Sequence, residues 1–373
     1  MKLRLGLDAR KLTDFGIGTY LQYLVRGLAQ RADIELTLVV RVGHEELAAN
    51  LAPGAALVPV RAGGYSLAEQ IRLPAALRRA KLDLVHVPHY VVPVATRFPI
   101  VTTVHDVIQL YYPPRGRSQL GLLYFRIMMK TALRRSRRVI TVSRASRSDL
   151  LHLFRADPGK VIVIPNGVDS ALAERPEPEA LAALRHEYGL KPPLILVVGN
   201  DKPHKNLEMA LRAFHLAVRR SNIPGQLVIV GGVPADGRLA RRAAHLGLGE
   251  RVRFLGRVPW KTLGELYHLS SLLLHVALYE GFGLPILEAM CAGLPVITSN
   301  LGAMRELGEG AARLVNPLEV QEIAEAIERV LVDDPLRRRM VMAGRQRAEA
   351  MTWDKTVDAT VAVYRRANGE VTG

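Results

Sequence analysis

The chain of 373 residues contains a single cysteine, so it cannot form an internal disulfide, and we expect Cys291 to be a small buried apolar side chain. It has no apolar run long enough to cross a bilayer, and its first residues lead directly into strand-like sequence and not into a signal peptide. Aromatic residues make up only 5% of the chain, which disfavours the stacking surfaces that bind single-stranded nucleic acid. These absences predict a cytoplasmic globular protein without a nucleic-acid partner.

Acidic residues are missing from one long stretch. Residues 107–148 contain ten Lys and Arg and no Asp or Glu. Of the net charge of +16, residues 1–175 carry +13 (26 basic against 13 acidic residues) and residues 176–373 carry +3 (25 against 22). A field of one sign attracts a polyanion, either nucleic acid or the anionic leaflet of a membrane.

The order of apolar patterns predicts the fold class. Short β-branched apolar runs alternate with patterns of helical period, which is typical of parallel sheets covered by helices on both faces. The length and the hydrophobic content of 49% exceed what one core usually holds. We expect strands at 3–7, 34–42, 57–60, 84–87, 100–104, 138–142, 161–164, 194–198, 227–231, 252–255, 271–276 and 295–298, and helices of the first half near 18–31, 66–80, 117–136 and 143–154.

A proline-rich acidic segment at 174–179 (ERPEPE) interrupts this alternation and is typical of a connection between domains. We therefore predict an α/β protein with two doubly wound Rossmann-like domains that face a central cleft. The N-terminal domain spans 1–172 and is completed by a C-terminal helix at 352–369. The C-terminal domain spans 173–351.

Glycines and polar residues follow the first-half strands. In doubly wound sheets, ligands bind beyond the carboxyl ends of the strands. The first strand is followed by Gly16-Ile17-Gly18, which is half of a dinucleotide fingerprint and also occurs as an ordinary turn. His105 follows the strand at 100–104, and the adjacent Asp106 could fix its tautomer or the local backbone.

The segment 199–206 (GNDKPHKN) follows the strand at 194–198. Gly199 ends this strand, Pro203 stands near a helix start, and Lys205 is placed where a helix N-terminus and an ammonium group can meet a diphosphate. The alternative is a solvated lysine in the first turn of a helix.

Two glutamates bracket a glycine-rich turn in the stretch 277–290 (ALYEGFGLPILEAM). Between Glu280 and Glu288, this turn can point backbone amides at an anion while Pro285 begins a helix. A carboxylate does not bind phosphate, but it accepts hydrogen bonds from the hydroxyl groups of a ribose. We therefore expect the amides to hold a diphosphate, Glu288 to hold the ribose, and Glu280 to face a sugar.

The paired glutamates resemble the Glu-x7-Glu motif of retaining glycosyltransferases of family 4, which have the two-Rossmann-domain fold called GT-B. The resemblance spans roughly residues 1–365, and the glycine-led start is most similar to bacterial mannosyltransferases that build polysaccharides or lipid-linked glycans. Further patterns resemble this family in family order at 8–10 (DAR), 16–20 (GIGTY), 83–86 (DLVH), 88–90 (PHY), 105–106 (HD), 141–143 (TVS), 165–169 (PNGVD) and 203–206 (PHKN).

The resemblance implies a role for each matching residue. His105 and Glu280 would be catalytic and would lie beside the donor sugar, and Lys205 would bind the donor diphosphate. Further sugar contacts are implied for Asp106, Gly281, Phe282 and Gly283. Further diphosphate contacts are implied for Gly16, Gly18, Asn200, Lys202, Gly283 and Leu284. Nucleoside contacts are implied for Gly199, Val258 and Glu288.

The implied reaction moves a hexose from a nucleotide-diphosphate sugar to a glycan or lipid-linked acceptor. Mannose from GDP-mannose is our first expectation, and the alternative is a UDP-sugar-dependent glucosyl- or N-acetylglucosaminyltransferase. Retaining members are thought to transfer on the same face, with the leaving phosphate taking the acceptor's proton. The chain has no Asp-x-Asp motif, so we expect no metal cofactor, and Lys205 with helix dipoles would stabilise the leaving group. Many members carry an arginine where this chain has Asn200, which removes one cationic phosphate contact unless Lys202 replaces it.

Other classes share some of these features. Phosphorylases and sugar-nucleotide epimerases can have this fold, but phosphorylases need a pyridoxal lysine and a longer chain, and epimerases usually lack the Glu-x7-Glu spacing. A non-enzymatic nucleic-acid binder would explain the charge of +16, yet the basic stretch lacks interleaved stacking side chains.

The basic stretch has a helical period of its own at 117–138. Arg126, Lys130, Arg134 and Arg137 recur at helical spacing. Beside them, an apolar stripe is expected from Leu120, Leu123, Tyr124, Ile127 and Met128. One interpretation is a helix that lies on the anionic inner face of a membrane, which would make the protein peripheral there. The other is an ordinary helix packed on the sheet with a solvated basic face.

Overall fold

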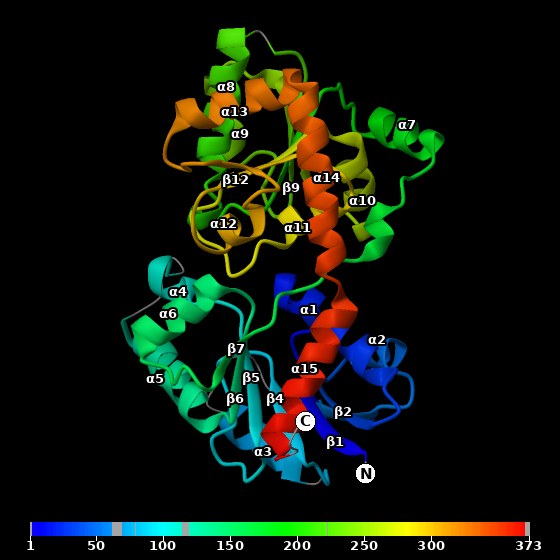
Figure 1. The fold of residues 1–373 in the computed structure, drawn as a ribbon, viewed down its shortest axis with the longest axis vertical. Coiled ribbons are helices and arrows are strands. Elements are labelled where there is room, and N and C mark those ends of the chain that lie inside the picture. Colours follow the sequence, from blue (N-terminus) through cyan, green and yellow to red (C-terminus); the bar gives the residue numbers. More distant parts are fainter. Residues whose placement is uncertain (1, 62–68, 79, 114–118, 222, 370–373) are drawn as a thin grey trace. The chain divides into compact units, whose positions relative to one another are not determined.

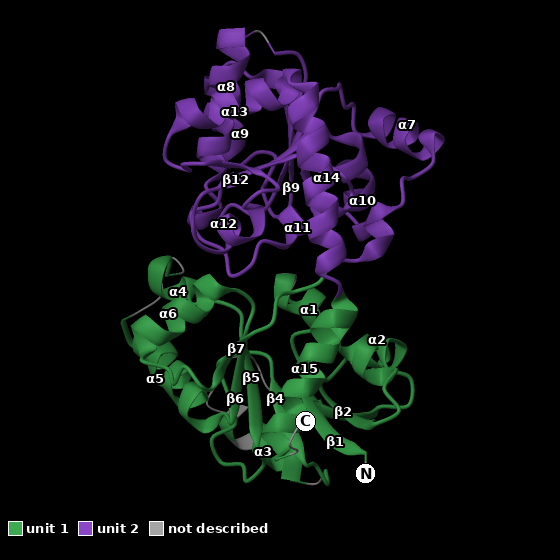
Figure 2. Ribbon diagram, in the orientation of Figure 1, with its two compact units in different colours: residues 1–167, 353–373 green, residues 168–352 purple. Residues whose placement is uncertain are grey.

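The computed structural model describes residues 2–61, 69–78, 80–113, 119–221 and 223–369 (Figure 1). The chain divides into two compact units (Figure 2). One consists of residues 1–167 and 353–373 and the other of residues 168–352. The first division falls five residues before the expected position 172, because Ser170–Ala173 (η1) packs on the second unit, where Cys291 Sγ lies 3.6 Å from the carbonyl oxygen of Asp169.

The first unit contains a parallel sheet in the order β3-β2-β1-β4-β5-β6-β7. Its strands are β1 (Leu3–Asp8), β2 (Ile34–Arg41), β3 (Ala56–Val60), β4 (Leu84–Val87), β5 (Ile100–Val104), β6 (Arg138–Thr141) and β7 (Val161–Val163). Its helices are α1 (Phe15–Ala29), α2 (Glu45–Leu51), α3 (Glu69–Arg78), α4 (Ile108–Tyr111), α5 (Gln119–Arg135), α6 (Arg144–Phe154) and α15 (Trp353–Asn368). Strands β4 and β5 are buried along their whole length, as expected for a sheet covered on both faces.

The second unit contains a parallel sheet in the order β10-β9-β8-β11-β12-β13. Its strands are β8 (Leu194–Val198), β9 (Gln226–Val230), β10 (Val252–Gly256), β11 (Leu272–His275), β12 (Val296–Ser299) and β13 (Arg313–Val315). Its helices after η1 are α7 (Pro178–Glu187), η2 (Pro203–Lys205), α8 (Leu207–Ser221), α9 (Arg238–His245), η3 (Gly249–Arg251), α10 (Trp260–Leu269), α11 (Leu284–Cys291), α12 (Gly302–Gly308), α13 (Val320–Val332) and α14 (Asp334–Ala350).

These two sheets confirm the predicted class of two doubly wound Rossmann-like domains. Each strand order reverses once, between β1 and β4 in the first unit and between β8 and β11 in the second. At such a switch point the loops after the two neighbouring strands diverge, and the space that they leave at the carboxyl edge is where ligands bind in this class of sheet.

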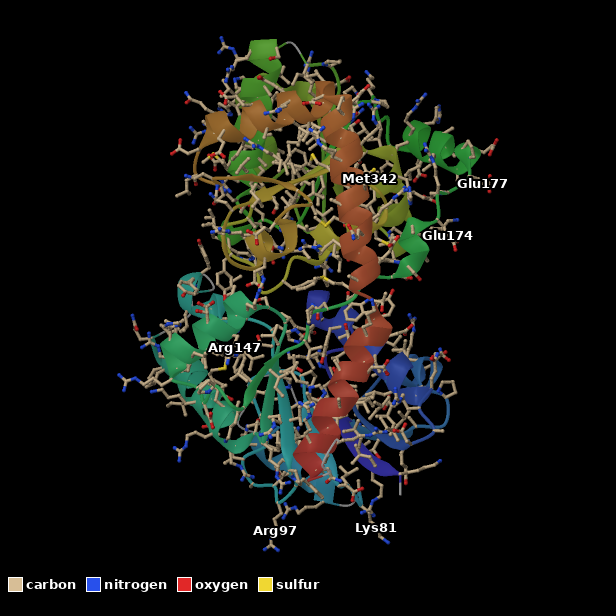
Figure 3. All side chains as sticks on the ribbon, in the orientation of Figure 1. Lys81, Arg97, Arg147, Glu174, Glu177 and Met342 are labelled. Carbon is tan, nitrogen blue, oxygen red and sulfur yellow. The ribbon has the colours of Figure 1, made fainter. Side chains whose placement is uncertain are left out.

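Several expectations differ from the structure. Gly16-Ile17-Gly18 was expected as a loop after β1 but lies inside the first turn of α1, and a methyl group at Gly18 would lie 2.7 Å from the carbonyl oxygen of Leu12. Gly18 is therefore required by backbone packing, whereas Gly16 faces open space. The acidic segment 174–179 lies within the second unit, where Glu174 and Glu177 are exposed (Figure 3). The parts of the expected helices at 66–68, 79 and 117–118 lie outside the described residues.

The C-terminal helix α15 returns to the first unit (Figure 2). Trp353 stacks on Tyr23 of α1, with ring centroids 4.7 Å apart. Near the other end of the helix, the hydroxyl of Tyr364 lies 2.7 Å from Nδ1 of the buried His86 on β4. The chain passes from one unit to the other twice, directly after Gly167 and directly before Trp353.

Candidate functional site

The loops after β8 and β11 are bonded to each other at the switch point of the second sheet. Leu278 N donates to the carbonyl oxygen of His204 over 2.7 Å, and Asn206 Nδ2 donates to that of Val276 over 3.0 Å. Asn206 adopts a left-handed backbone with φ of 54°, a conformation that asparagine tolerates better than most residues. These bonds fix the two loops against each other and bring Lys205 next to Glu280.

Glycines bring the carboxyl ends of the neighbouring strands into close approach. A methyl group at Gly231, which has φ of 131°, would lie 1.9 Å from the carbonyl oxygen of Gly199. Gly231 N in turn donates to the carbonyl oxygen of Gly256 over 2.7 Å. Only glycine fits this position, so the backbone itself forms the edge beside the Lys205 loop.

Lys205 and Glu280 form a largely buried ion pair. Lys205 Nζ lies 2.5 Å from Glu280 Oε1, and the two side chains are 16% and 15% exposed. His275 Nε2 lies 3.3 Å from the same oxygen. Burial alone would raise the pKa of Glu280, but the charge of Lys205 and the contact with His275 hold it well below its usual range. Glu280 is therefore an anion whose charge Lys205 neutralises locally.

Helix α11 begins directly after this pair. Gly283 occupies the N-cap with φ of 101°, no side chain caps the helix, and Pro285 stands in its first turn. Phe282, which is 7% exposed, anchors the turn in the core. The backbone amides of the first turn are directed at the same edge as Lys205, an arrangement that suits an anion.

Glu288 lies about one turn into α11 and has a different environment. Its side chain is buried, and Tyr267 on α10 donates a hydrogen bond of 2.6 Å to Oε2. Burial raises the pKa of Glu288 to about 7, although the bond from Tyr267 and the charge of Lys205 act in the opposite direction. The pKa values of the two glutamates of this motif are thus shifted in opposite directions, since Glu280 is the one that contacts Lys205.

His105 follows β5 in the first unit. Burial lowers its pKa to about 4, so the imidazole is neutral at physiological pH. One ring nitrogen bonds the backbone of Pro88, Nε2 is buried and has no hydrogen-bond partner within the described residues, and Tyr20 packs edge-on with centroids 4.9 Å apart. Asp106 Oδ1 accepts a hydrogen bond of 2.9 Å from Ile108 N, so this carboxylate holds the local backbone, one of the two roles expected for it.

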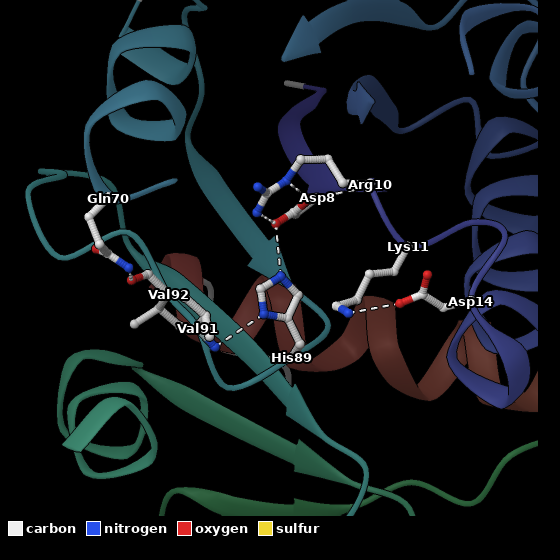
Figure 4. A network of polar contacts seen from close by, with 8 residues as sticks. All are labelled: Asp8, Arg10, Lys11, Asp14, Gln70, His89, Val91 and Val92. Atoms are coloured by element: carbon white, nitrogen blue, oxygen red, sulfur yellow. Dashed lines mark hydrogen bonds and ion pairs between the residues drawn. The ribbon is translucent and has the colours of Figure 1, made fainter. Parts of the chain in front are cut away.

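A second buried network surrounds the ends of β1 and β4 (Figure 4). Arg10 donates to Asp8 through Nε and Nη2, at 2.8 and 2.6 Å. Val91 N donates to His89 Nδ1, which leaves Nε2 to carry the proton and donate to Asp8 Oδ2 over 3.1 Å. Burial would raise the pKa of Asp8, but Arg10 holds it well below its usual range. The sequence shows these residues only as motifs that resemble a family pattern, because the contact between His89 and Asp8 joins segments about eighty residues apart.

The structure divides the expected site residues between two sheet edges. The edge of the second unit gathers Gly199, Asn200, Lys202, Lys205, Val258, Glu280, Gly281, Phe282, Gly283, Leu284 and Glu288. The edge of the first unit has Gly16 and Gly18 in α1, and His105 and Asp106 after β5. Lys202 is exposed, Val258 is half-buried, and Asn200 Oδ1 is buried without a partner among the described residues.

Known protein families match this architecture along most of the chain. The family described as Glycosyltransferase Family 4 matches residues 16–172, and the one described as Glycosyl transferases group 1 matches residues 163–347. The chain belongs to the family 4 glycosyltransferases. This hexosyltransferase is therefore an enzyme, and the alternative of a non-enzymatic nucleic-acid binder is wrong.

Curated relatives of this glycosyltransferase include mannosyltransferases. O-antigen chain mannosyltransferase B of Escherichia coli is 26% identical over 98% of this chain and 100% of its own length. An MMP alpha-(1->4)-mannosyltransferase of Mycolicibacterium hassiacum is 31% identical over 74% of this chain and 67% of its own length. Among solved structures, Anabaena HepE in complex with UDP and glucose superposes with a TM-score of 0.77 at 21% identity, covering 98% of this chain and 100% of that one, which confirms the GT-B fold.

The raised pKa of Glu288 predicts a pH dependence of stability. Between its ordinary value of 4.5 and about 7, the folded protein binds more protons at this carboxyl than the unfolded chain does, so the free energy of unfolding falls as the pH rises. Glu288→Gln removes this dependence and can still accept the bond from Tyr267. We expect the stability of the wild type relative to Glu288→Gln to fall by up to about 3 kcal/mol between about pH 5 and 8, measured by urea unfolding. A constant difference across this range would show that Glu288 titrates normally.

Proposed function

We propose that this enzyme transfers mannose from GDP-mannose, with retention of configuration, to a glycan or lipid-linked acceptor, and that it works as a cytoplasmic protein on the inner face of a membrane. The observation that supports the donor assignment is the largely buried Lys205–Glu280 pair beside the start of α11, which combines a cation, backbone amides and a carboxylate at one switch point. The mannose assignment is supported by the names of the relatives, O-antigen chain and MMP mannosyltransferases.

Donor binding would separate the ion pair and give each of its two residues a new partner on the donor. The diphosphate brings more negative charge to Lys205 than one carboxylate does, so Lys205 turns to it, and Glu280 is released to accept hydrogen bonds from sugar hydroxyls. The amides of Gly283 and Leu284 and the dipole of α11 add to the stabilisation of the leaving diphosphate. Asn200 contributes a neutral amide here, and the exposed Lys202 supplies a second positive charge.

The nucleoside would extend from the diphosphate toward Glu288. The ribose hydroxyls can donate to the carboxylate oxygens, and such bonds favour its charged form. Burial of Glu288 disfavours its charged form, so a bound ribose would supply hydrogen bonds that stabilise the carboxylate. These bonds would add to the hydrogen bond from Tyr267 and would not replace it. Gly199 and the backbone at Val258 lie at the ends of β8 and β10 on the same edge and complete the nucleoside contacts.

His105 would meet the donor sugar from the first unit. Its neutral ring has Nε2 as a buried acceptor without a partner among the described residues, which suits a sugar hydroxyl. Gly16, which faces open space at the start of α1, allows the backbone to approach the diphosphate, and the leaving phosphate takes the acceptor's proton on the same face. Catalysis then consists mainly of positioning and electrostatic stabilisation.

A UDP-sugar-dependent glucosyl- or N-acetylglucosaminyltransferase is the second candidate. It is favoured by HepE, whose structure contains UDP and glucose, and other relatives are named D-inositol 3-phosphate glycosyltransferases, a name that does not specify mannose. The two candidates differ in the base and in the sugar, and a panel of nucleotide sugars separates them.

We expect GDP-mannose to raise the melting temperature more than any UDP-sugar in such a panel. A ligand at one hundred times its dissociation constant stabilises the folded state by about 2.7 kcal/mol. The measurement is a thermal-shift screen followed by transfer assays with the stabilising donors. A larger shift with UDP-glucose or UDP-N-acetylglucosamine would replace the mannose assignment with the second candidate.

Glu280→Gln and Lys205→Ala should separate donor binding from turnover. Glu280→Gln releases Lys205 from its partner, so we expect GDP to bind at least as tightly while turnover falls by about 10²-fold or more. Lys205→Ala should weaken GDP binding by about 10- to 100-fold, since a charge-assisted bond is lost. Lys261→Ala, an exposed lysine of the same unit, is the matched control. Calorimetry and initial rates measure both effects, and full activity of Glu280→Gln would contradict its catalytic role.

Turnover should also be independent of divalent ions. We expect unchanged initial rates after dialysis against a chelator, because Lys205 and the start of α11 supply the positive potential for the diphosphate. Loss of activity that added Mg²⁺ or Mn²⁺ restores would show that a metal ion holds the leaving group.

A further inference from the structure

Helix α5 of the first unit packs on its sheet with one face only. Its buried side chains are Phe125, Met128, Met129, Ala132 and Leu133. At about 100° per residue, these five positions occupy an arc of roughly 140° around the helix. Met128 belongs to this inner face, and Tyr124 is half-buried at its edge, so both are wrongly placed in the apolar stripe that the sequence predicts.

The opposite face of α5 exposes large apolar side chains. Leu120 is 75% exposed, Leu123 53% and Ile127 52%. Two exposed basic residues, Lys130 and Arg134, continue the same line, because the five positions follow one another at spacings of three, four, three and four. They fall within an arc of about 80°. We call this line of Leu120, Leu123, Ile127, Lys130 and Arg134 the outer row.

The outer row has a distinct polarity along the helix. Its three N-terminal members are aliphatic and its two C-terminal members are cationic. The exposed Arg126 lies beside it, and no acidic residue occurs between residues 107 and 148. Arg137 does not belong to this surface, because it follows the end of α5 and donates to the carbonyl oxygen of Ala367 over 2.7 Å. The expected basic face is therefore confined to Arg126, Lys130 and Arg134.

We propose that the outer row docks this enzyme on an anionic lipid surface, with the N-terminal half of α5 inserted at the acyl boundary and its C-terminal half on the headgroup phosphates. A row of aliphatic side chains followed by cations matches the surface of an anionic bilayer, where apolar acyl chains lie beneath negatively charged headgroups. A nucleic acid would use the cations but leave the leucines in water. No helix of the described chain is long and apolar enough to span a bilayer, and the outer row requires none.

This inference deepens the proposed work at a membrane but does not depend on the donor chemistry, because vesicle binding needs no catalysis. The first test is co-sedimentation of the full chain with vesicles of phosphatidylglycerol and phosphatidylcholine. We expect binding at low salt to vesicles rich in phosphatidylglycerol, at least tenfold weaker binding to pure phosphatidylcholine, and weakening as salt is added. No binding to the anionic vesicles would overturn the proposal.

Two sets of substitutions separate the halves of the outer row. Leu120→Ser with Leu123→Ser and Ile127→Ser should reduce binding at least tenfold and leave the salt dependence of the remainder intact. Lys130→Ser with Arg134→Ser should also reduce binding, and it should flatten the salt dependence. Matched controls in the second unit are Leu318→Ser with Val332→Ser and Met342→Ser, which are 63%, 79% and 70% exposed in the wild type, and Arg338→Ser with Arg339→Ser. Equal losses in the controls would attribute binding to general hydrophobicity or net charge.

A third measurement reports the orientation of the helix. Leu123→Cys carrying an environment-sensitive fluorophore should shift to the blue with anionic vesicles, whereas Met342→Cys with the same label should not; the native Cys291 is buried. Circular dichroism and GDP binding verify that every variant is folded. Vesicle binding without a shift at position 123 would overturn the inserted orientation, and displacement of the vesicles by RNA at equal charge would identify a nucleic-acid surface instead.

Discussion

The largely buried ion pair between Lys205 and Glu280 is the interaction around which the second unit arranges its carboxyl edge. Two charges that are largely removed from water persist only when each has a close partner, and here the partners come from loops 75 residues apart in sequence. The backbone bonds from Leu278 and Asn206 fix the separation of these loops, and the glycine at position 231 lets the strand ends approach. The local conformations therefore bring one cation and one carboxylate together at this edge of the sheet.

The same edge holds a second carboxylate with the opposite electrostatics. The charge of Lys205 lowers the pKa of Glu280, whereas Glu288 accepts a hydrogen bond from the hydroxyl of Tyr267 and burial raises its pKa to about 7. Eight residues separate them, and the N-terminus of α11 begins between them, so one short segment offers a permanent anion, a set of backbone donors and a carboxyl group that becomes charged when further donors arrive. The proposed nucleotide-sugar donor likewise has three chemically distinct parts: the sugar, the diphosphate and the ribose.

The sequence predicted the features that depend on neighbouring residues, such as the strands and the motifs after them, but not the contacts between residues far apart in the chain. Short apolar runs located the strands, and the motifs that follow them fell at the predicted sheet edges, whereas β13 (Arg-Leu-Val) has only two apolar residues and was not predicted. Gly16 and Gly18 were expected in a loop after β1, but both lie in the first turn of α1, where close packing on Leu12 requires a glycine at position 18. In α5, steps of four from Leu120 to Tyr124 and Met128 drift by about 40° each toward the core, so only alternating steps of three and four follow the outer row. The Lys205–Glu280 pair and the Asp8 network had no local signal.

The first unit is coupled to its own C-terminal helix by a chain of buried hydrogen bonds. Tyr364 of α15 contacts His86, whose other ring nitrogen lies 2.8 Å from the hydroxyl of Thr103, and Thr103 in turn contacts the hydroxyl of Tyr20 over 3.1 Å. Tyr20 is the residue that packs edge-on against His105. Since each of these groups is buried, the loss of one partner leaves another unsatisfied, and the position of the His105 ring depends on residues from both ends of the chain. The return of α15 to the first unit is thus part of the construction of that sheet edge and not merely a covering for the sheet.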